Sequence, residues 1–296
     1  MARLEGSMVA IVTPMKDGAV DLRALRDLVE WQVVEGTEGL VPCGTTGEGA
    51  TLTAKERAEV IRATIEQVRG RAVVIAGAGS NATHEAIESV KMARELKADA
   101  ALVVTPYYNK PTQEGLYRHY VAIWEAARFP VVAYNVPSRT SVDMLPETVA
   151  RLAKAGAIAG IKEATANMDR QIQLVEKVGK DAIAYLSGDD FTVLPYIACG
   201  GQGVISVVGN IAPRAMKELV VAARRADLAK ALEKQVAMAE LNRMLFVETN
   251  PGPVKAAVAL LGRATGELRL PLAPVSDANL AKIKDAMQRF GLLKSA

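Results

Sequence analysis

Eight short apolar runs alternate with segments of helical periodicity along the first 210 residues of this chain. Each run is nearly continuous in apolar residues and lacks the alternation of a half-exposed strand. Such runs are typical of parallel strands, because helices cover a parallel sheet and leave little of it in water. We expect the strands in VAIVTP (9–14), GLVPCG (39–44), AVVIAGAG (72–79), AALVVTPYY (100–108), VVAYNVP (131–137), IAGIKEA (158–164), IAYLSGDD (183–190) and GVISVVGN (203–210).

Eight strand–helix units in a chain of 296 residues predict an α/β fold of the (β/α)8 TIM barrel type. A doubly wound open sheet is the alternative. That fold usually has a Gly-rich dinucleotide-binding turn after its first strand, and VTPMKDG (12–18) is not such a turn. Two helix starts are also marked: TAKE (53–56) fits a capping box of Thr53 and Glu56, and Pro213 suits a first helical position.

The chain continues for about seventy residues after the eighth unit. Three further helical patterns lie near 229–246, 251–262 and 277–291, separated by the Pro-rich turns NPGP and LPLAP. A barrel does not require them. We therefore divide the chain into a barrel with the active site over residues 1–226 and a C-terminal helical extension over residues 227–296.

The composition argues against several classes of protein. The net charge is only +3 and the basic residues are scattered, so no nucleic-acid partner is expected. No apolar run approaches the ~18 residues that span a membrane. The amino-terminal MARLEGSMVAIVTP lacks the apolar core of a signal peptide. We expect a cytoplasmic protein with no membrane partner.

The cysteines and histidines give no sign of a metal site. Cys43 and Cys199 are too few for a disulfide framework or a thiolate site, and we expect both to be small buried residues. His84 and His119 fall in helical segments, where solvated helix faces are expected. No cluster of His, Asp and Glu has metal-ligand spacing, so the sequence predicts no metal.

Polar residues gather where the expected strands end, and in a (β/α)8 barrel those ends carry the chemistry. We expect SGDD (187–190) to supply polar groups to the pocket rim or to cap a helix. The polar or small residues at these ends are Thr45, Thr46, Glu48, Tyr107, Tyr108, Tyr134, Asn135, Arg139, Lys162, Glu163, Ser187, Gly188, Asp189 and Ser206.

Lys162 stands in AIAGIKEAT (157–165), after an apolar run of the kind that lies inside a protein. A buried lysine is costly unless it is paired or loses its proton. Burial disfavours the protonated amine, and a desolvated lysine that faces a carbonyl substrate can form a Schiff base. The alternative is a lysine that reaches out from a strand end to pair with a carboxylate such as Glu163.

Three further features favour the Schiff base. Tyr134 precedes Lys162 by one strand and could carry a proton to and from a carbinolamine, although it could also be a packed core tyrosine. The turn GTTGEG (44–49) offers consecutive N–H groups and two hydroxyls to a carboxylate, or is merely a tight turn. Arg139 could grip a second carboxylate, or lie on the surface. Together they predict carbonyl chemistry on a keto acid with an acidic partner.

The chain resembles the dihydrodipicolinate synthase family over essentially its whole length, and more widely the pyruvate-dependent class I lyases. GIKEAT and GTTGE mark the wider superfamily, and YNVPSRT is the narrower signal. The segments that carry the resemblance are GTTGE (44–48), TPYYNKP (105–111), YNVPSRT (134–140), GIKEAT (160–165), SGDD (187–190) and NPGPVKAA (250–257).

The resemblance implies a condensation of pyruvate with L-aspartate 4-semialdehyde to 4-hydroxy-tetrahydrodipicolinate, the first committed step of the diaminopimelate route to lysine. Lys162 would form the imine with pyruvate, and the backbone and hydroxyls of Thr45 and Thr46 would hold the pyruvate carboxylate. The enamine would then attack the aldehyde. The covalent imine replaces any metal or organic cofactor.

The resemblance also implies the remaining roles. Tyr134 would carry protons, linked through Thr46 to Tyr108, which a neighbouring subunit inserts. The usual assembly is a homotetramer, a dimer of dimers. Arg139 would bind the carboxylate of the aldehyde substrate, and the pocket floor would be shaped by Gly188 and Ile205.

Lysine-sensitive members bind L-lysine at the dimer cleft, and three residues match that effector site. Three others depart from it, where sensitive enzymes commonly have a serine and two histidines. We expect weak or absent inhibition, because small polar groups are lost and a guanidinium stands near a cationic ligand. The matching residues are Asn81, Glu85 and Tyr107, and the departing ones are Gly49, Ala54 and Arg57.

Two other functions remain open at this stage. A sister lyase acting on N-acetylneuraminate or a 2-keto-3-deoxy sugar acid would share Lys162, Tyr134 and the GTTGE turn. Arg139 argues against it, because a sugar needs room and hydroxyl partners rather than a cation. A barrel that only senses a keto acid would need no reactive amine.

Overall fold

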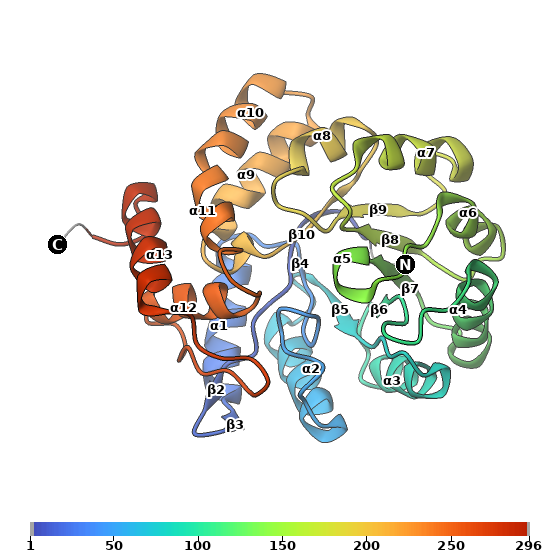
Figure 1. Ribbon diagram of the computed structural model, residues 1–296, viewed down its shortest axis with the longest axis horizontal. Helices are drawn as coiled ribbons and strands as arrows, with labels where there is room; N and C mark the ends of the chain where they lie inside the picture. The colour runs from blue at the N-terminus through green and yellow to red at the C-terminus, as the bar shows by residue number, and fades with distance from the viewer. Residues whose placement is uncertain (1–2, 295–296) are drawn as a thin grey trace.

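A computed structural model describes residues 3–294 of the chain. Eight parallel strands close into a barrel in the order β1-β10-β9-β8-β7-β6-β5-β4 (Figure 1). The predicted (β/α)8 barrel is confirmed. The strands are β1 (Gly6–Val9), β4 (Gly39–Leu40), β5 (Val73–Gly77), β6 (Ala100–Val104), β7 (Val131–Asn135), β8 (Gly160–Glu163), β9 (Ala184–Ser187) and β10 (Gly203–Ser206).

The strands fall within the expected runs except at the amino end. Strand β1 begins at Gly6, and most of the expected strand 9–14 is loop instead. A two-stranded hairpin of β2 (Met15–Lys16) and β3 (Ala19–Val20), which the sequence did not predict, follows this loop.

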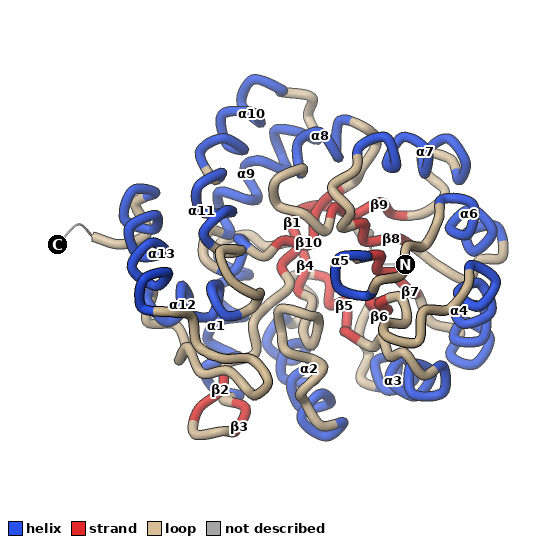
Figure 2. Tube along the Cα trace, in the orientation of Figure 1, coloured by secondary structure: helices blue, strands red, loops and turns tan. Residues whose placement is uncertain are grey.

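Helices surround the barrel on its outer face, blue around red in Figure 2. The Thr53–Glu56 capping box is present, and Pro213 is the first residue of α9, as expected. Each helix within residues 3–294 is too short or too polar to span a bilayer. The helices of the barrel are α1 (Leu22–Val34), α2 (Ala54–Val68), α3 (Thr83–Glu95), α4 (Gln113–Ala127), α5 (Pro137–Thr140), α6 (Pro146–Lys154), α7 (Met168–Val178), α8 (Val193–Ala198) and α9 (Pro213–Arg224).

Two apolar layers hold the barrel together. The larger lies between strands and helices, and the smaller fills the barrel itself, so the barrel interior is a packed core. Side chains along a strand alternate between these layers. On β8, Ile161 belongs to the outer layer, while Lys162 faces the interior. The interior is filled by Met8, Val41, Ile75, Leu102, Val132, Tyr134, Leu186 and Ile205.

The C-terminal extension consists of helices, as the three patterns predict, and lies to one side of the barrel in orange and red (Figure 1). Its helix α10 packs on α9, and α13 packs on α11 and α12. The pattern at 229–246 forms two helices that meet at Met238. The division of the chain at residue 226 stays a prediction. The four helices are α10 (Leu228–Ala237), α11 (Ala239–Met244), α12 (Gly252–Leu260) and α13 (Asp277–Phe290).

Two expectations about single residues were wrong. His119 is buried on the inner face of α4, where its Nδ1 lies 3.0 Å from the Thr83 hydroxyl, and burial lowers its pKa to about 4. Cys199 is only half-buried, because it ends α8 at the start of a Gly-rich turn. His84 is exposed and Cys43 is buried, as expected.

Candidate active site

The turn after β4 carries Thr45 and Thr46 at the carboxyl end of the barrel. The Glu48 amide donates to the Thr45 carbonyl at 3.1 Å, and Gly49 donates to Gly44 at 3.1 Å. A Cβ on Gly47 would lie 2.9 Å from the Cys43 nitrogen, so the turn needs glycine there. This tight fold leaves Thr45 half-buried and Thr46 buried.

Lys162 is buried inside the barrel, with 5% of its surface exposed. It is paired in register with Tyr134 on the neighbouring strand, so the two side chains share one face of the sheet. The Lys162 amine lies 4.4 Å from the centre of the Tyr134 ring. The structure therefore puts a buried amine beside a phenol, as the sequence suggested.

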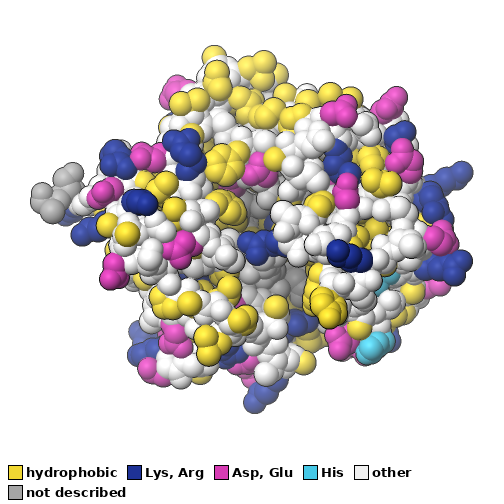
Figure 3. Space-filling view, in the orientation of Figure 1, with side chains coloured by type: hydrophobic (Ala, Val, Ile, Leu, Met, Phe, Trp, Pro, Cys, Tyr) yellow, Lys and Arg dark blue, Asp and Glu magenta, His cyan; other side chains and the backbone are white. Residues whose placement is uncertain are grey.

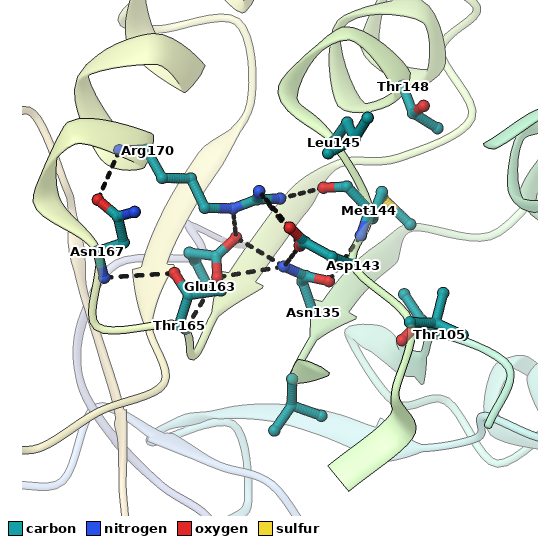
Figure 4. A network of polar contacts seen from close by, with 12 residues as sticks. Thr105, Asn135, Asp143, Met144, Leu145, Thr148, Glu163, Thr165, Asn167 and Arg170 are labelled. Carbon is teal, nitrogen blue, oxygen red and sulfur yellow. Dashed lines mark hydrogen bonds and ion pairs between the residues drawn. The ribbon is translucent and has the colours of Figure 1, made fainter. Parts of the chain in front are cut away.

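Glu163 does not pair with Lys162, because adjacent residues on a strand face opposite sides. Its carboxylate accepts from Arg170 Nε at 2.6 Å and from the Thr165 amide at 2.9 Å. Asn135 donates to the same carboxylate at 3.2 Å (Figure 4). The alternative in which Lys162 pairs with Glu163 is wrong.

Arg170, which the sequence reasoning missed, ties Glu163 to the loop after α5. Its Nη1 lies 3.2 Å from the Asp143 carboxylate, and its Nη2 donates to the Met144 carbonyl. Asn135 also donates to Asp143 at 2.8 Å. Because α5 and this loop are continuous, the network in Figure 4 fixes the segment that carries Arg139.

A cavity of about 500 Å³ opens beside Tyr134, the strand neighbour of Lys162, at the carboxyl ends of the strands. Thr45, Tyr134, Arg139 and Asn250 line it, and the hollow lies near the centre of the face in Figure 3. Arg139 is exposed at the rim. A guanidinium there can meet a carboxylate that enters from solvent.

The remaining predicted pocket residues lie in or beside the barrel interior. Gly188 is in contact with the lysine, because a Cβ built on it would lie 3.1 Å from Lys162 Cε. Ile205 is fully buried in the interior layer. A residue larger than glycine at position 188 would press on the side chain of Lys162.

Tyr107 and Tyr108 are adjacent in the chain but lie in different surroundings. Tyr107 lines the cavity, whereas Tyr108 is 90% exposed with a left-handed φ of +72°. Within one chain, the structure does not bring Tyr108 to Thr46 and Tyr134. The side chain of Asn81 donates to the Tyr107 carbonyl at 3.2 Å and fixes the start of this segment.

The SGDD segment binds backbone and side-chain groups of neighbouring turns, and neither of its aspartates is the N-cap residue of a helix. The Asp190 carboxylate accepts from the Val207 and Val208 amides, each at 2.9 Å, at the turn after β10. Burial raises the pKa of this carboxyl. Asp189 accepts from the Thr192 hydroxyl at 2.9 Å, and burial raises its pKa as well. The sequence allowed a helix cap or a rim position, and Asp190 instead ties the segment after β9 to the turn after β10.

The C-terminal extension closes one side of the site through Asn250. Its Nδ2 donates to the Thr46 hydroxyl at 3.0 Å, and its backbone carbonyl accepts from Arg139 Nη2 at 3.4 Å. In the sequence, Asn250 begins a Pro-rich turn and a segment that carries the family resemblance, and neither feature predicts its contacts. The contact spans 204 residues, so no local pattern marks it.

Glu48 lines the cavity and also anchors the same extension. Its carboxylate accepts from the Lys255 amine at 2.6 Å, and both side chains are fully buried. Its second oxygen accepts from the Arg269 amide at 3.1 Å. Burial lowers the pKa of Lys255, and the Glu48 partner opposes that shift.

Four of the six residues compared with the expected effector site line the same cavity: Gly49, Arg57, Glu85 and Tyr107. Glu85 accepts from the Ser80 hydroxyl at 2.7 Å. Arg57 donates to the Ser89 hydroxyl at 3.2 Å and to the Gly49 carbonyl at 3.0 Å. A guanidinium therefore lies in the same cavity wall as Glu85, since Ser89 is one turn further along α3, and Ala54 is exposed at the start of α2.

Comparison with known proteins decides the family. Residues 3–290 match the family model described as the dihydrodipicolinate synthetase family. The chain belongs to this family. It is 86% identical over 292 residues to 4-hydroxy-tetrahydrodipicolinate synthase of Anaeromyxobacter dehalogenans, with 99% of each chain covered. It is 52% identical over 289 residues to the enzyme of the same name from a Geobacter species, which covers 98% of this chain and 99% of that one.

Solved structures agree with this assignment. Dihydrodipicolinate synthase from Aquifex aeolicus superposes with a TM-score of 0.96 at 45% identity, over 99% of this chain and 100% of that one. The chloride-inhibited enzyme from Acinetobacter baumannii, solved with pyruvate, has a TM-score of 0.96 at 45% identity and covers 98% and 100%. A monomeric dihydrodipicolinate synthase variant has a TM-score of 0.95 at 43% identity and covers 98% and 97%.

Proposed function

We propose that this protein condenses pyruvate with L-aspartate 4-semialdehyde to 4-hydroxy-tetrahydrodipicolinate, through a Schiff base on Lys162. The reaction is the first committed step of the diaminopimelate route to lysine. Family membership supports the reaction. The observation that carries the mechanism is the buried amine of Lys162, 4.4 Å from the ring of Tyr134, which lines a cavity that Arg139 also lines.

The first half of the reaction joins pyruvate to the enzyme. The neutral amine of Lys162 attacks C2 of pyruvate, and the carbinolamine loses water to leave a C=N bond. Amide N–H groups and hydroxyls of the Thr45–Thr46 turn hold the carboxylate. Loss of a proton from the methyl carbon then gives the enamine. Tyr134 lies within reach of Lys162 and moves protons to and from the carbinolamine oxygen.

The second half forms the carbon–carbon bond. The enamine carbon attacks the aldehyde carbon, and the resulting alkoxide takes a proton. The amino group of the semialdehyde then attacks C2, closes the ring and releases the Lys162 amine. Arg139 pairs with the carboxylate of the semialdehyde, as its exposed place on the cavity rim supports. Gly188 leaves room beside the imine, and Ile205 forms the apolar floor.

The imine carbon supplies the electron sink for this chemistry, so the mechanism calls for no metal or organic cofactor. This remains a proposal, as does the cytoplasmic location. A sugar-acid lyase would use the same lysine and tyrosine. Family membership and the rim cation favour the short acidic aldehyde.

Tyr108 enters the proposal through a second subunit. Within a single chain, the 90% exposed side chain and the left-handed backbone of Tyr108 bring no stabilising contact. A neighbouring copy of the chain would bury this side chain. We assign it to the site of the neighbour, where it continues the relay from Tyr134 through Thr46. The proposed assembly is therefore at least a dimer, and two such dimers form the proposed homotetramer. One relative with a solved structure is a monomeric variant, so the assembly has to be measured.

The experiment that tests the function is mass spectrometry after incubation with pyruvate and borohydride, with a parallel turnover assay on L-aspartate 4-semialdehyde. We expect one reduced-pyruvate adduct, mapped to Lys162, and turnover. Lys255 is an internal comparison, because it is also buried but is held by Glu48 at 2.6 Å. An adduct without turnover would point to sugar-acid substrates. A folded protein with no adduct on Lys162 would disprove the mechanism.

A further inference from the structure

Asn250 touches both groups that are proposed to hold substrate carboxylates. Its side-chain Nδ2 lies 3.0 Å from the Thr46 hydroxyl on the pyruvate side. Its backbone carbonyl accepts from Arg139 Nη2, 3.4 Å away on the semialdehyde side. The residue is 4% exposed, and it lines the cavity. One residue of the C-terminal extension thus bridges the two halves of the site.

The Asn250 amide controls what the Thr46 hydroxyl can do. A threonine hydroxyl has one proton to donate and two lone pairs that accept. The Asn250 NH2 group only donates, so it occupies a lone pair of Thr46 and leaves the hydroxyl proton free. That proton can then be donated to a bound carboxylate or along the relay to Tyr134. Without the Asn250 amide, the Thr46 hydroxyl can rotate about its Cβ–Oγ1 bond and point its proton away from the carboxylate.

Asn250 is itself held firmly in place. Lys255, five residues further on, is anchored to Glu48 by an ion pair of 2.6 Å in which both side chains are fully buried. Glu48 belongs to the same turn as Thr46. The ion pair therefore fixes the spacing between the turn and the segment that carries Asn250.

We propose that Asn250 is a positioning residue that directs the Thr46 hydroxyl toward the bound keto acid. The inference rests on the proposed function, since Thr46 matters only if pyruvate binds there. Asn250 does not touch the reacting atoms. It acts through Thr46, and its side-chain amide gives the C-terminal extension a part in positioning that hydroxyl.

The test compares Asn250→Ala and Asn250→Asp with the native enzyme in steady-state kinetics. Alanine removes the side-chain donor to Thr46. Aspartate replaces that donor with an acceptor, so the Thr46 hydroxyl would donate its proton to residue 250. We expect kcat/KM for pyruvate to fall about 10- to 100-fold, the size of a small misplacement at a reacting centre. The KM for the semialdehyde should change less than about threefold, because the backbone carbonyl that meets Arg139 remains.

A double-mutant cycle separates positioning from folding. Thr46→Val removes the hydroxyl through which Asn250 acts. In that background Asn250→Ala should cost less than about twofold, since contacting residues are not additive. Additive losses would overturn the proposal, and so would a loss that falls equally on both substrates.

Asn242 is the matched control. It is fully buried, its Nδ2 donates to the Asp190 carbonyl at 3.2 Å, and its Oδ1 lacks a hydrogen-bond partner among the described residues, as does Oδ1 of Asn250. Asn242→Ala should lower Tm without changing the KM for pyruvate. If Asn250→Ala behaves the same way, the proposal is wrong while the function stands. If the native enzyme forms no adduct on Lys162, both fail.

Discussion

The amine of Lys162 lies 4.4 Å from the centre of the Tyr134 ring, and the two residues are direct neighbours in strand register. This pairing fixes the relative height of amine and phenol in the barrel, because a slip of one residue would turn one of them outward. The barrel thus presents a nucleophile and a proton carrier as one rigid unit.

Tyr134→Phe tests the proton carrier. We expect kcat to fall about 10²- to 10⁴-fold, the usual contribution of a general acid or base, while the ring still packs over Lys162. Tyr120→Phe is the control, since its hydroxyl donates to the Val103 carbonyl at 2.8 Å in the core. It should lower stability and leave kcat unchanged. Equal turnover by Tyr134→Phe and native enzyme would refute the role.

Mixed subunits test the assignment of Tyr108 to a neighbour. Lys162→Met and Tyr108→Phe should each lose most activity alone. Mixed after unfolding and refolding together, they should recover about a quarter of native activity, because random pairing gives half hybrids with one complete site each. Mixing without subunit exchange is the control. Failure to recover activity in confirmed hybrids would mean that Tyr108 serves its own chain or no site.

The barrel could be predicted because its signals are local. Each strand is a short apolar run, and strand ends in a parallel barrel collect on one face. Lys162 stood out for the same reason, as a charge in an apolar run. The order of the strands along the chain alone predicted that Tyr134 and Lys162 lie on neighbouring strands.

The contacts that complete the site could not be predicted, because they join distant segments. Asn250 meets Thr46 across 204 residues, and Lys255 meets Glu48 across 207. Glu48 lines the cavity, as its place after a strand suggested, but its buried ion pair with the extension has no local signal in the sequence. His119 was misjudged because a helix position does not reveal which neighbours cover it.

The buried pair of Lys255 and Glu48 should dominate the stability of the extension. Lys255→Met leaves a buried carboxylate unpaired and should cost about 3–5 kcal/mol in urea unfolding. The double variant Glu48→Gln with Lys255→Met should lose less. Lys177→Met breaks the exposed pair with Glu147, at 3.2 Å, and should cost about 0–1 kcal/mol. Similar losses for the two lysines would contradict this ranking.

Acid should loosen the extension through Glu56. The Arg269 guanidinium holds the pKa of this carboxyl at about 2. A lowered folded pKa adds stability that is complete above the unfolded value near ~4.3 and is lost as pH falls toward 2. Glu56→Gln should therefore flatten the loss of Tm between about pH 5 and pH 2. Glu59→Gln, on the same helix but 4.0 Å from Lys55, should not.

L-Lysine should inhibit weakly. The Arg57 guanidinium is fixed in the cavity wall by Ser89 and Gly49, near the residues that match the effector site, and it repels a ligand that carries two ammonium groups. Turnover measured against lysine should show half-inhibition only above the millimolar range. Arg57→Ala should make inhibition stronger, because it removes the repulsion, while Arg151→Ala on the outer surface should not. Half-inhibition of the native enzyme by sub-millimolar lysine would show that Glu85 and Tyr107 suffice for the effector despite Arg57.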